Sequence, residues 1–147
     1  MFPEIDYDFE AEEEIEEAAE STELGKVPLY DFENNCYALK DGKMVMCDQS
    51  EAVRQWVAFL IKTKMDKYKV YDGTEFGTYI EDYIGYKSND IGFVMSEIER
   101  EITEKAELNR AIDYVDGFDF KKEDGLLKIY LTVYLKTGEE VEVESDV

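Results

Sequence analysis

The sequence predicts an α+β fold: an N-terminal β-hairpin, about three helices, and a C-terminal three-stranded antiparallel meander packed on the helices. Three observations support this class. Residues 126–135 alternate strictly between apolar and polar side chains, as in a half-buried strand. Glycine turns flank that stretch at Asp124-Gly125 and Thr137-Gly138. Upstream of residue 110, apolar residues recur at helical spacing instead. We expect one domain spanning residues 25–147.

The first predicted element is a hairpin with strands at 36–40 and 43–47 around the turn Asp41-Gly42. This turn places Cys36 opposite Cys47 as a hydrogen-bonded pair. The Cβ atoms of such a pair lie at the wide end of about 4.5–5.5 Å, whereas a disulfide needs about 3.5–4.5 Å. Cytoplasmic synthesis also disfavours a disulfide. We therefore expect two buried, reduced thiols.

The first predicted helix begins at Asp48, and Glu51 three residues later completes the spacing of a capping box. We expect Trp56 to anchor the core from this helix. Its apolar stripe consists of Val53, Trp56, Val57, Leu60 and Ile61. The stretch Lys62–Lys69 that follows is locally basic. Two interpretations stay open for it: a solvated helix end, or a contact with an acidic neighbour.

Two more helices are predicted before the meander. The second spans Glu75–Ile84, with Thr74 as its cap and Gly85 as its stop. The third spans Ile91–Glu107 and is capped by Ser88 or Asn89. Its core-facing stripe consists of Ile91, Val94, Met95, Ile98 and Ile102.

The registers of the meander follow from its turns. A two-residue turn at Asp124-Gly125 pairs Phe120 with Ile129 and Phe118 with Leu131, all on the apolar face. Continuing that register puts Asp116 opposite Val133, on the wrong face. A bulge at Gly117 would redirect the strand there.

The next turn decides which side chains of the last strand are buried. A two-residue loop at Thr137-Gly138 would turn Glu140 and Glu142 toward the core. A three-residue loop, Lys136-Thr137-Gly138, pairs Val141 with Val133 and Val143 with Leu131 instead. We choose the second register because it buries the valines. It leaves an edge strand at 139–143 with glutamates on its opposite face.

The N-terminal residues 1–24 form an acidic arm, with eleven Asp or Glu and no Lys or Arg. This segment is either a solvated tail or an arm that folds on a partner. The whole chain has a net charge of −21, which argues against binding nucleic acid or an anionic membrane surface. A basic protein partner fits this charge better. The N-terminus lacks the pattern of a signal peptide, so we expect the chain to be made in the cytoplasm and to stay there until it is released by lysis or assembly.

The sequence shows no pattern typical of an enzyme or a cofactor site. The chain has no His for general base catalysis, no glycine-rich phosphate loop and no GxSxG. Two Cys without His do not make a zinc site, and the spacing of Asp113, Asp116 and Asp119 does not fit a calcium loop. We expect no catalytic residue, no metal and no cofactor.

The stretch from Met46 to Val143 resembles the sheath initiators of contractile phage tails, above all those of Gram-positive prophages and R-type bacteriocins. The resemblance depends on a helix ending at a threonine, scattered tyrosines, an aromatic-Gly pair, an acidic helix with Arg, and a strand with apolar residues three apart. Here these are Thr63, Tyr68, Tyr71, Phe76-Gly77, Glu97, Glu99, Arg100, Ile112, Val115 and Phe118. Some related baseplate proteins are called lysozyme-like, but nothing in these residues supports that activity.

The resemblance implies a structural baseplate protein, six copies around the tail tube, whose sheet edge takes up strands of the first sheath ring. Its implied partners are the tail sheath protein, baseplate wedge proteins and tail tube or tube-initiator proteins. The implied sheath-facing residues are Glu139, Glu140, Val141, Glu142 and Val143. Relatives carry Glu-Pro-Arg before the first meander strand, where this chain has Glu107-Leu108-Asn109-Arg110. The wedge-facing candidates are Glu107, Asn109, Arg110, Lys62, Lys64 and Lys67.

Two other hypotheses compete with this one. The net charge permits an acidic decoy that mimics the charge of DNA, although the acids are concentrated in residues 1–24. A small hydrolase is the third hypothesis, because among 37 carboxylates some pair always lies close together.

Overall fold

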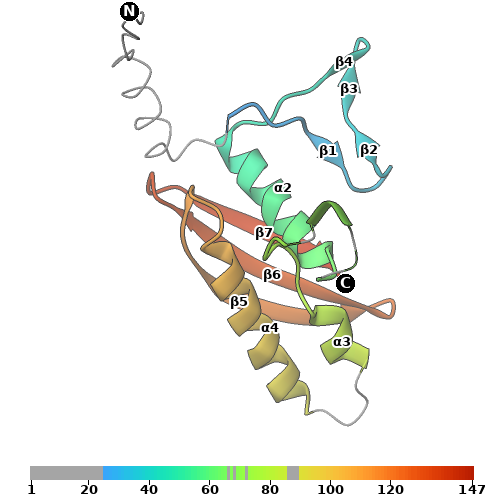
Figure 1. Cartoon of the computed structure of the whole chain (residues 1–147), viewed down its shortest axis with the longest axis vertical. Coiled ribbons are helices and arrows are strands. Elements are labelled where there is room, and N and C mark those ends of the chain that lie inside the picture. Colours follow the sequence, from blue (N-terminus) through green and yellow to red (C-terminus); the bar gives the residue numbers. More distant parts are fainter. Residues whose placement is uncertain (1–24, 66, 68, 72, 86–89) are drawn as a thin grey trace, which may run out of the picture.

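A computed structural model describes residues 25–147, except 66, 68, 72 and 86–89. The predicted acidic arm and the proposed caps Ser88 and Asn89 lie outside the described residues. The described chain has the α+β architecture that the sequence predicts: short strand pairs, helices, then a three-stranded antiparallel sheet. Figure 1 shows helices α2 and α4 over one face of that sheet.

The C-terminal sheet consists of β5 (Ile112–Glu123), β6 (Leu126–Leu135) and β7 (Glu140–Asp146), with β6 in the centre. The predicted three-residue turn is confirmed, since Val141 pairs with Val133 and Val143 with Leu131. Gly138 takes φ +94°, a conformation that glycine adopts without steric cost. This turn buries both valines, and each is 2% exposed.

The predicted bulge in β5 is also confirmed. Asp116 pairs with Thr132 and Asp119 with Tyr130, so Gly117 and Phe118 together face Leu131. Gly117 has φ +68°, as a glycine at a bulge commonly does. The extra residue brings Val115, rather than Asp116, opposite Val133. The apolar face of β5 is therefore continuous on both sides of the bulge.

Helices α2 (Gln49–Lys62) and α4 (Ile91–Ala106) cover the apolar face of the sheet, α2 over β7 and α4 over β5. Asp48 and Glu51 form the predicted capping box at the start of α2. The N-cap of α4 is Asp90, whose side chain accepts from the Gly92 N–H, so the prediction of Ser88 or Asn89 as the cap is wrong. Trp56 is half-buried and lies edge-on to Phe76 at 5.6 Å, at the border of the core rather than inside it. The fully buried core residues include Val53, Val57, Ile61, Ile98, Ile102, Ile129 and Val133.

The predicted hairpin is correct at its turn and wrong at its outer end. Strands β3 (Leu39–Lys40) and β4 (Lys43–Met44) pair around Asp41-Gly42 as expected. Cys36, however, lies in β2 (Cys36–Tyr37) and pairs with Asp31 of β1 (Tyr30–Asp31). The Cys47 N–H donates instead to Val27 O. Both thiols are free, but Cys36 is exposed and Cys47 is only half-buried, so the expectation of two buried thiols is wrong.

The second predicted helix is much shorter than expected. After a 3-10 turn, η1 (Lys69–Tyr71), residues 76–79 form no helix, Thr78 bridges to Lys64, and α3 spans Ile80–Gly85. Thr78 exchanges main-chain hydrogen bonds with the end of α2: its N–H donates to Thr63 O at 2.9 Å, and Met65 N–H donates to its carbonyl at 3.0 Å. A Cβ on Gly77 would lie 3.2 Å from Thr63 O, so glycine permits this close approach.

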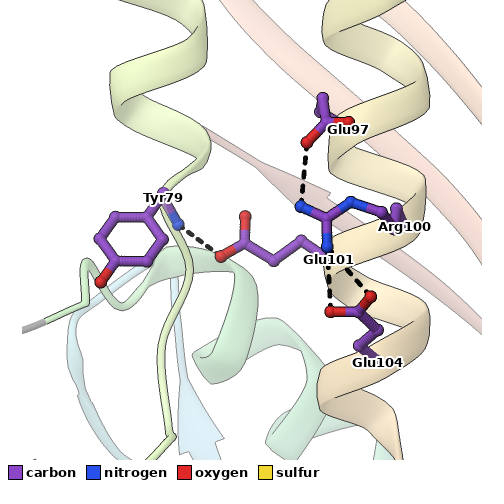
Figure 2. A network of polar contacts seen from close by, with 5 residues as sticks. All are labelled: Tyr79, Glu97, Arg100, Glu101 and Glu104. Atoms are coloured by element: carbon purple, nitrogen blue, oxygen red, sulfur yellow. Dashed lines mark hydrogen bonds and ion pairs between the residues drawn. The ribbon is translucent and has the colours of Figure 1, made fainter.

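A buried carboxylate of α4 holds the same segment, as Figure 2 shows. Glu101 is 4% exposed, and its Oε1 accepts from the Tyr79 N–H at 2.8 Å. Its other oxygen has no partner among the described atoms, and burial raises the pKa of this carboxyl. On the solvent side of the same helix, Arg100 forms ion pairs with Glu97 and Glu104.

Candidate interaction site

The outer edge of β7 carries main-chain groups that β6 does not use. Leu127 and Val147 exchange two hydrogen bonds, at 3.2 and 3.0 Å. Such pairs recur at every second residue of an antiparallel ladder, so Ser145, Val143 and Val141 bond to β6 as well. The N–H and C=O groups of Glu140, Glu142 and Glu144 therefore point away from the sheet. These groups are a template on which another strand can pair.

Polar side chains of α2 run along this edge. Ser50 donates to the Glu139 carboxylate at 3.0 Å, and Lys62 pairs with Asp146. Between them, the Arg54 Nε donates to the main-chain carbonyl of Glu142 at 3.0 Å. Lys62 lowers the pKa of the Asp146 carboxyl, mainly by this hydrogen bond. Arg54 thus occupies the middle acceptor of the free edge, so an added strand has to displace its guanidinium.

The five sheath-facing candidates divide into two groups. Val141 and Val143 are buried against the helices, and their main-chain groups bond to β6. Glu139, Glu140 and Glu142 are exposed. The predicted edge is therefore present, but the groups able to bond a partner strand belong to its glutamates. Arg54 is absent from the predicted set, because on a helix an exposed arginine carries no signal of the strand beside it.

The turn between α4 and β5 holds three wedge-facing candidates. Glu107 and Arg110 are exposed, whereas Asn109 is 4% exposed. The Asn109 side-chain oxygen accepts from the Ala111 N–H at 3.0 Å, and its main chain bonds both Ala106 and Ile112. Asn109 thus fixes the turn, and Glu107 and Arg110 present their side chains to solvent on either side of it.

The three lysine candidates do not share one surface role. Lys62 pairs with Asp146 and lies over the Phe32 ring, 5.6 Å from its centroid. Lys64 pairs with Asp82 at 2.8 Å, and this hydrogen bond raises the pKa of its ammonium. Lys67 is exposed. Lys62 and Lys64 therefore link the end of α2 to β7 and to α3, and both contact an acidic neighbour within the same chain.

The family model of the contractile injection system sheath initiator matches residues 26–140. This match covers most of the chain, from the first short strand to the start of β7. The chain belongs to the sheath initiator family. A search of the curated proteins finds no match. Family membership implies contacts with the sheath and with baseplate or tail components, and it indicates a structural protein rather than an enzyme.

Some of the residues behind the resemblance lie together in this sheath initiator. Thr63 caps α2, Phe76 packs on Trp56, and Gly77 lies against the main chain at Thr63 and Met65. They join α2 to the segment before α3, so they stabilise the fold.

Neither the structure nor the family match favours an acidic decoy. Within the described residues, no group of three or more acidic or Cys side chains is placed to hold a metal ion. In the same part of the chain, no helix is long and apolar enough to span a membrane.

Proposed function

We propose that this sheath initiator starts sheath assembly by taking a strand of the first sheath ring onto the outer edge of β7. The observation that carries the proposal is the set of outward main-chain groups at Glu140, Glu142 and Glu144. Strand addition of this kind draws its affinity from main-chain hydrogen bonds. The exposed glutamate side chains favour an incoming strand that carries Lys or Arg beside them.

Arg54 limits pairing at the outer edge of β7. Its contact with Glu142 O and the charges of the glutamates both disfavour unselective pairing of β7 with another edge. A strand with basic residues offsets the charges and replaces the single Arg54 hydrogen bond by several. The sheath initiator therefore stays monomeric until its β7 edge meets the sheath protein.

We further propose six copies around the tail tube, in contact with tube or tube-initiator proteins, in a phage tail or R-type bacteriocin assembled in the cytoplasm and released by lysis. Glu107 and Arg110, exposed beside the Asn109 turn, are the proposed contacts with the baseplate wedge, together with Lys67. Lys62 and Lys64 support this surface indirectly by fixing the end of α2.

The test is Glu142→Pro. Glu142 N–H points outward, so proline removes a donor that β6 does not use and places its ring where the partner strand would lie. The matched control is Glu142→Thr, which removes the same charge but keeps the N–H. Deleting β7 would be a poorer test because it also removes two core valines.

We expect particles with Glu142→Pro to assemble baseplates that contain the sheath initiator but lack sheath, as seen by electron microscopy. Glu142→Thr should give sheathed particles. Purified Glu142→Thr should melt within a few degrees of the parent protein, since surface substitutions usually change stability by about 0.5 kcal/mol or less. Purified Glu142→Pro should still unfold cooperatively, because β6 does not use the N–H that it loses. Normal sheaths on particles with Glu142→Pro would refute strand addition at β7.

A further inference from the structure

The face of the sheet opposite the helices presents ordered rows of aromatic and acidic side chains. Register fixes these rows, because residues paired across antiparallel strands lie on the same face. Nearest the 136–138 turn, the first row is Tyr114, Tyr134 and Glu140, and the second is Asp116, Thr132 and Glu142.

Tyr114 and Tyr134 form a stacked pair on this face. Their ring centroids are 4.3 Å apart, with an interplanar angle of 11°. Tyr114 remains 50% exposed, so the pair presents aromatic surface to solvent. Beside it lie the small residues Gly117 and Thr132, where a hollow of about 640 Å³ opens. Its charged lining residues are Glu142, Asp119 and Glu144 together with Arg54 and Lys121.

Three carboxylates lie beside the tyrosine pair: Glu140 in the same row, and Asp116 and Glu142 in the next row. Among the described residues, no Lys or Arg forms an ion pair with Asp116, Glu140 or Glu142, and the Arg54 Nε donates to the main-chain carbonyl of Glu142. The lysines of this face lie further along the strands, Lys121 over Tyr130 and Lys128 beside Glu123 and Glu144. Partial burial, with the nearby Glu140 and Asp116 charges, raises the pKa of the Tyr134 hydroxyl.

We propose that the Tyr114–Tyr134 pair, with Asp116, Glu140 and Glu142 beside it, is a docking surface for an arginine-bearing segment of a partner protein. A guanidinium is planar, so it stacks on an aromatic ring while its N–H groups bond a carboxylate. A lysine ammonium is a compact point charge and stacks less well. This surface uses side chains of the sheet face, whereas the proposed sheath contact uses the main chain of the β7 edge.

The test titrates the full chain with two probe peptides, acetyl-Gly-Arg-Gly-Arg-Gly-amide and its lysine counterpart, followed by NMR in about 50 mM salt. Two variants remove parts of the surface: Tyr114→Thr with Tyr134→Thr, and the near-isosteric Asp116→Asn with Glu140→Gln. The control is Glu81→Gln with Glu99→Gln, two exposed acids on α3 and α4. Thermal melts confirm that each variant folds. If the tyrosine variant does not fold, binding to the Asp116→Asn, Glu140→Gln variant decides the result.

We expect the arginine peptide to shift the Tyr114, Thr132 and Glu140 signals and to bind about fivefold more tightly than the lysine peptide. Each surface variant should weaken arginine binding about fivefold, and the control should leave it within about twofold. Equal binding of the two peptides, unchanged binding to the surface variants, or shifts centred elsewhere would overturn the proposal. So would a dimer, detected by sedimentation, that the tyrosine variant abolishes, since the occupant would then be a second copy. None of these outcomes bears on strand addition, which Glu142→Pro tests separately.

Discussion

Deleting Gly117 should harm this protein less than replacing it. Gly117 is the one extra residue of the β5 bulge, where two residues face Leu131. Without it, Phe118 pairs with Leu131, and every other residue of β5 keeps both its partner and its face. No buried contact is lost, so we expect the deletion to lower the free energy of unfolding by about 1 kcal/mol or less.

Substitution keeps the bulge and strains it. Alanine at φ +68° adopts the left-handed region, at a cost of about 1–2 kcal/mol. Its Cβ would also lie 3.4 Å from the Thr132 hydroxyl oxygen, which adds little if Thr132 changes rotamer. Gly117→Ala should therefore be less stable than the deletion, and Gly117→Asn should fall between them because asparagine tolerates this conformation.

The matched control is deletion of Asp119. It also removes the bulge, but it leaves Gly117 opposite Leu131 and turns Phe118 to the open face. Phe118 packs on the core beside Phe120, so losing its partial burial should cost about 1–2 kcal/mol. Urea unfolding followed by circular dichroism measures all four variants. If the two deletions are equally destabilising, Gly117 is not a removable insertion and the reasoning is refuted.

Three further predictions concern the helices. Asp48→Ala should destabilise the protein by about 0.5–2 kcal/mol in urea melts, because it opens the capping box of α2; no change would refute the role of the cap. Trp56→Ala should cost about 2–3 kcal/mol, below the cost for a fully buried tryptophan, and an unchanged melting temperature would exclude its contact with Phe76. Burial raises the pKa of Glu101 in the folded protein. Its contribution to the free energy of unfolding is therefore full below the unfolded pKa near 4.5 and is lost as the pH rises through the folded pKa. Glu101→Gln should therefore gain stability relative to the parent protein across that rise in pH, and a constant difference would contradict the raised pKa.

Local signals predicted the meander and the start of α2 well. The alternation in β6, the position of Gly138 and the two valines of β7 permit one register that buries apolar side chains, and that register is observed. The Asp48 capping box likewise depends on residues three apart in the chain. In both cases the deciding contacts join residues close in sequence or follow from the burial of a single face.

Contacts distant in sequence account for the errors. The predicted helix at 75–84 has helical spacing, but the main chain at Thr78 bonds Thr63 and Met65 instead, and only α3 remains. Cys36 pairs with Asp31 rather than Cys47, because β1 takes the position that a longer hairpin would need. Both outcomes depend on a competing strand partner, and periodicity within one segment carries no information about such a partner.

The sequence by itself determined the fold class, the register of the sheet and the existence of a charged edge at β7, because side-chain burial with a period of two leaves one solution. The tertiary structure alone decided how that edge is presented. It placed α2 along β7, so that Arg54 covers the Glu142 carbonyl, and it stacked Tyr114 on Tyr134 beside carboxylates. These arrangements join residues about 20 to 88 positions apart, and their geometry exists only once helices and strands have packed.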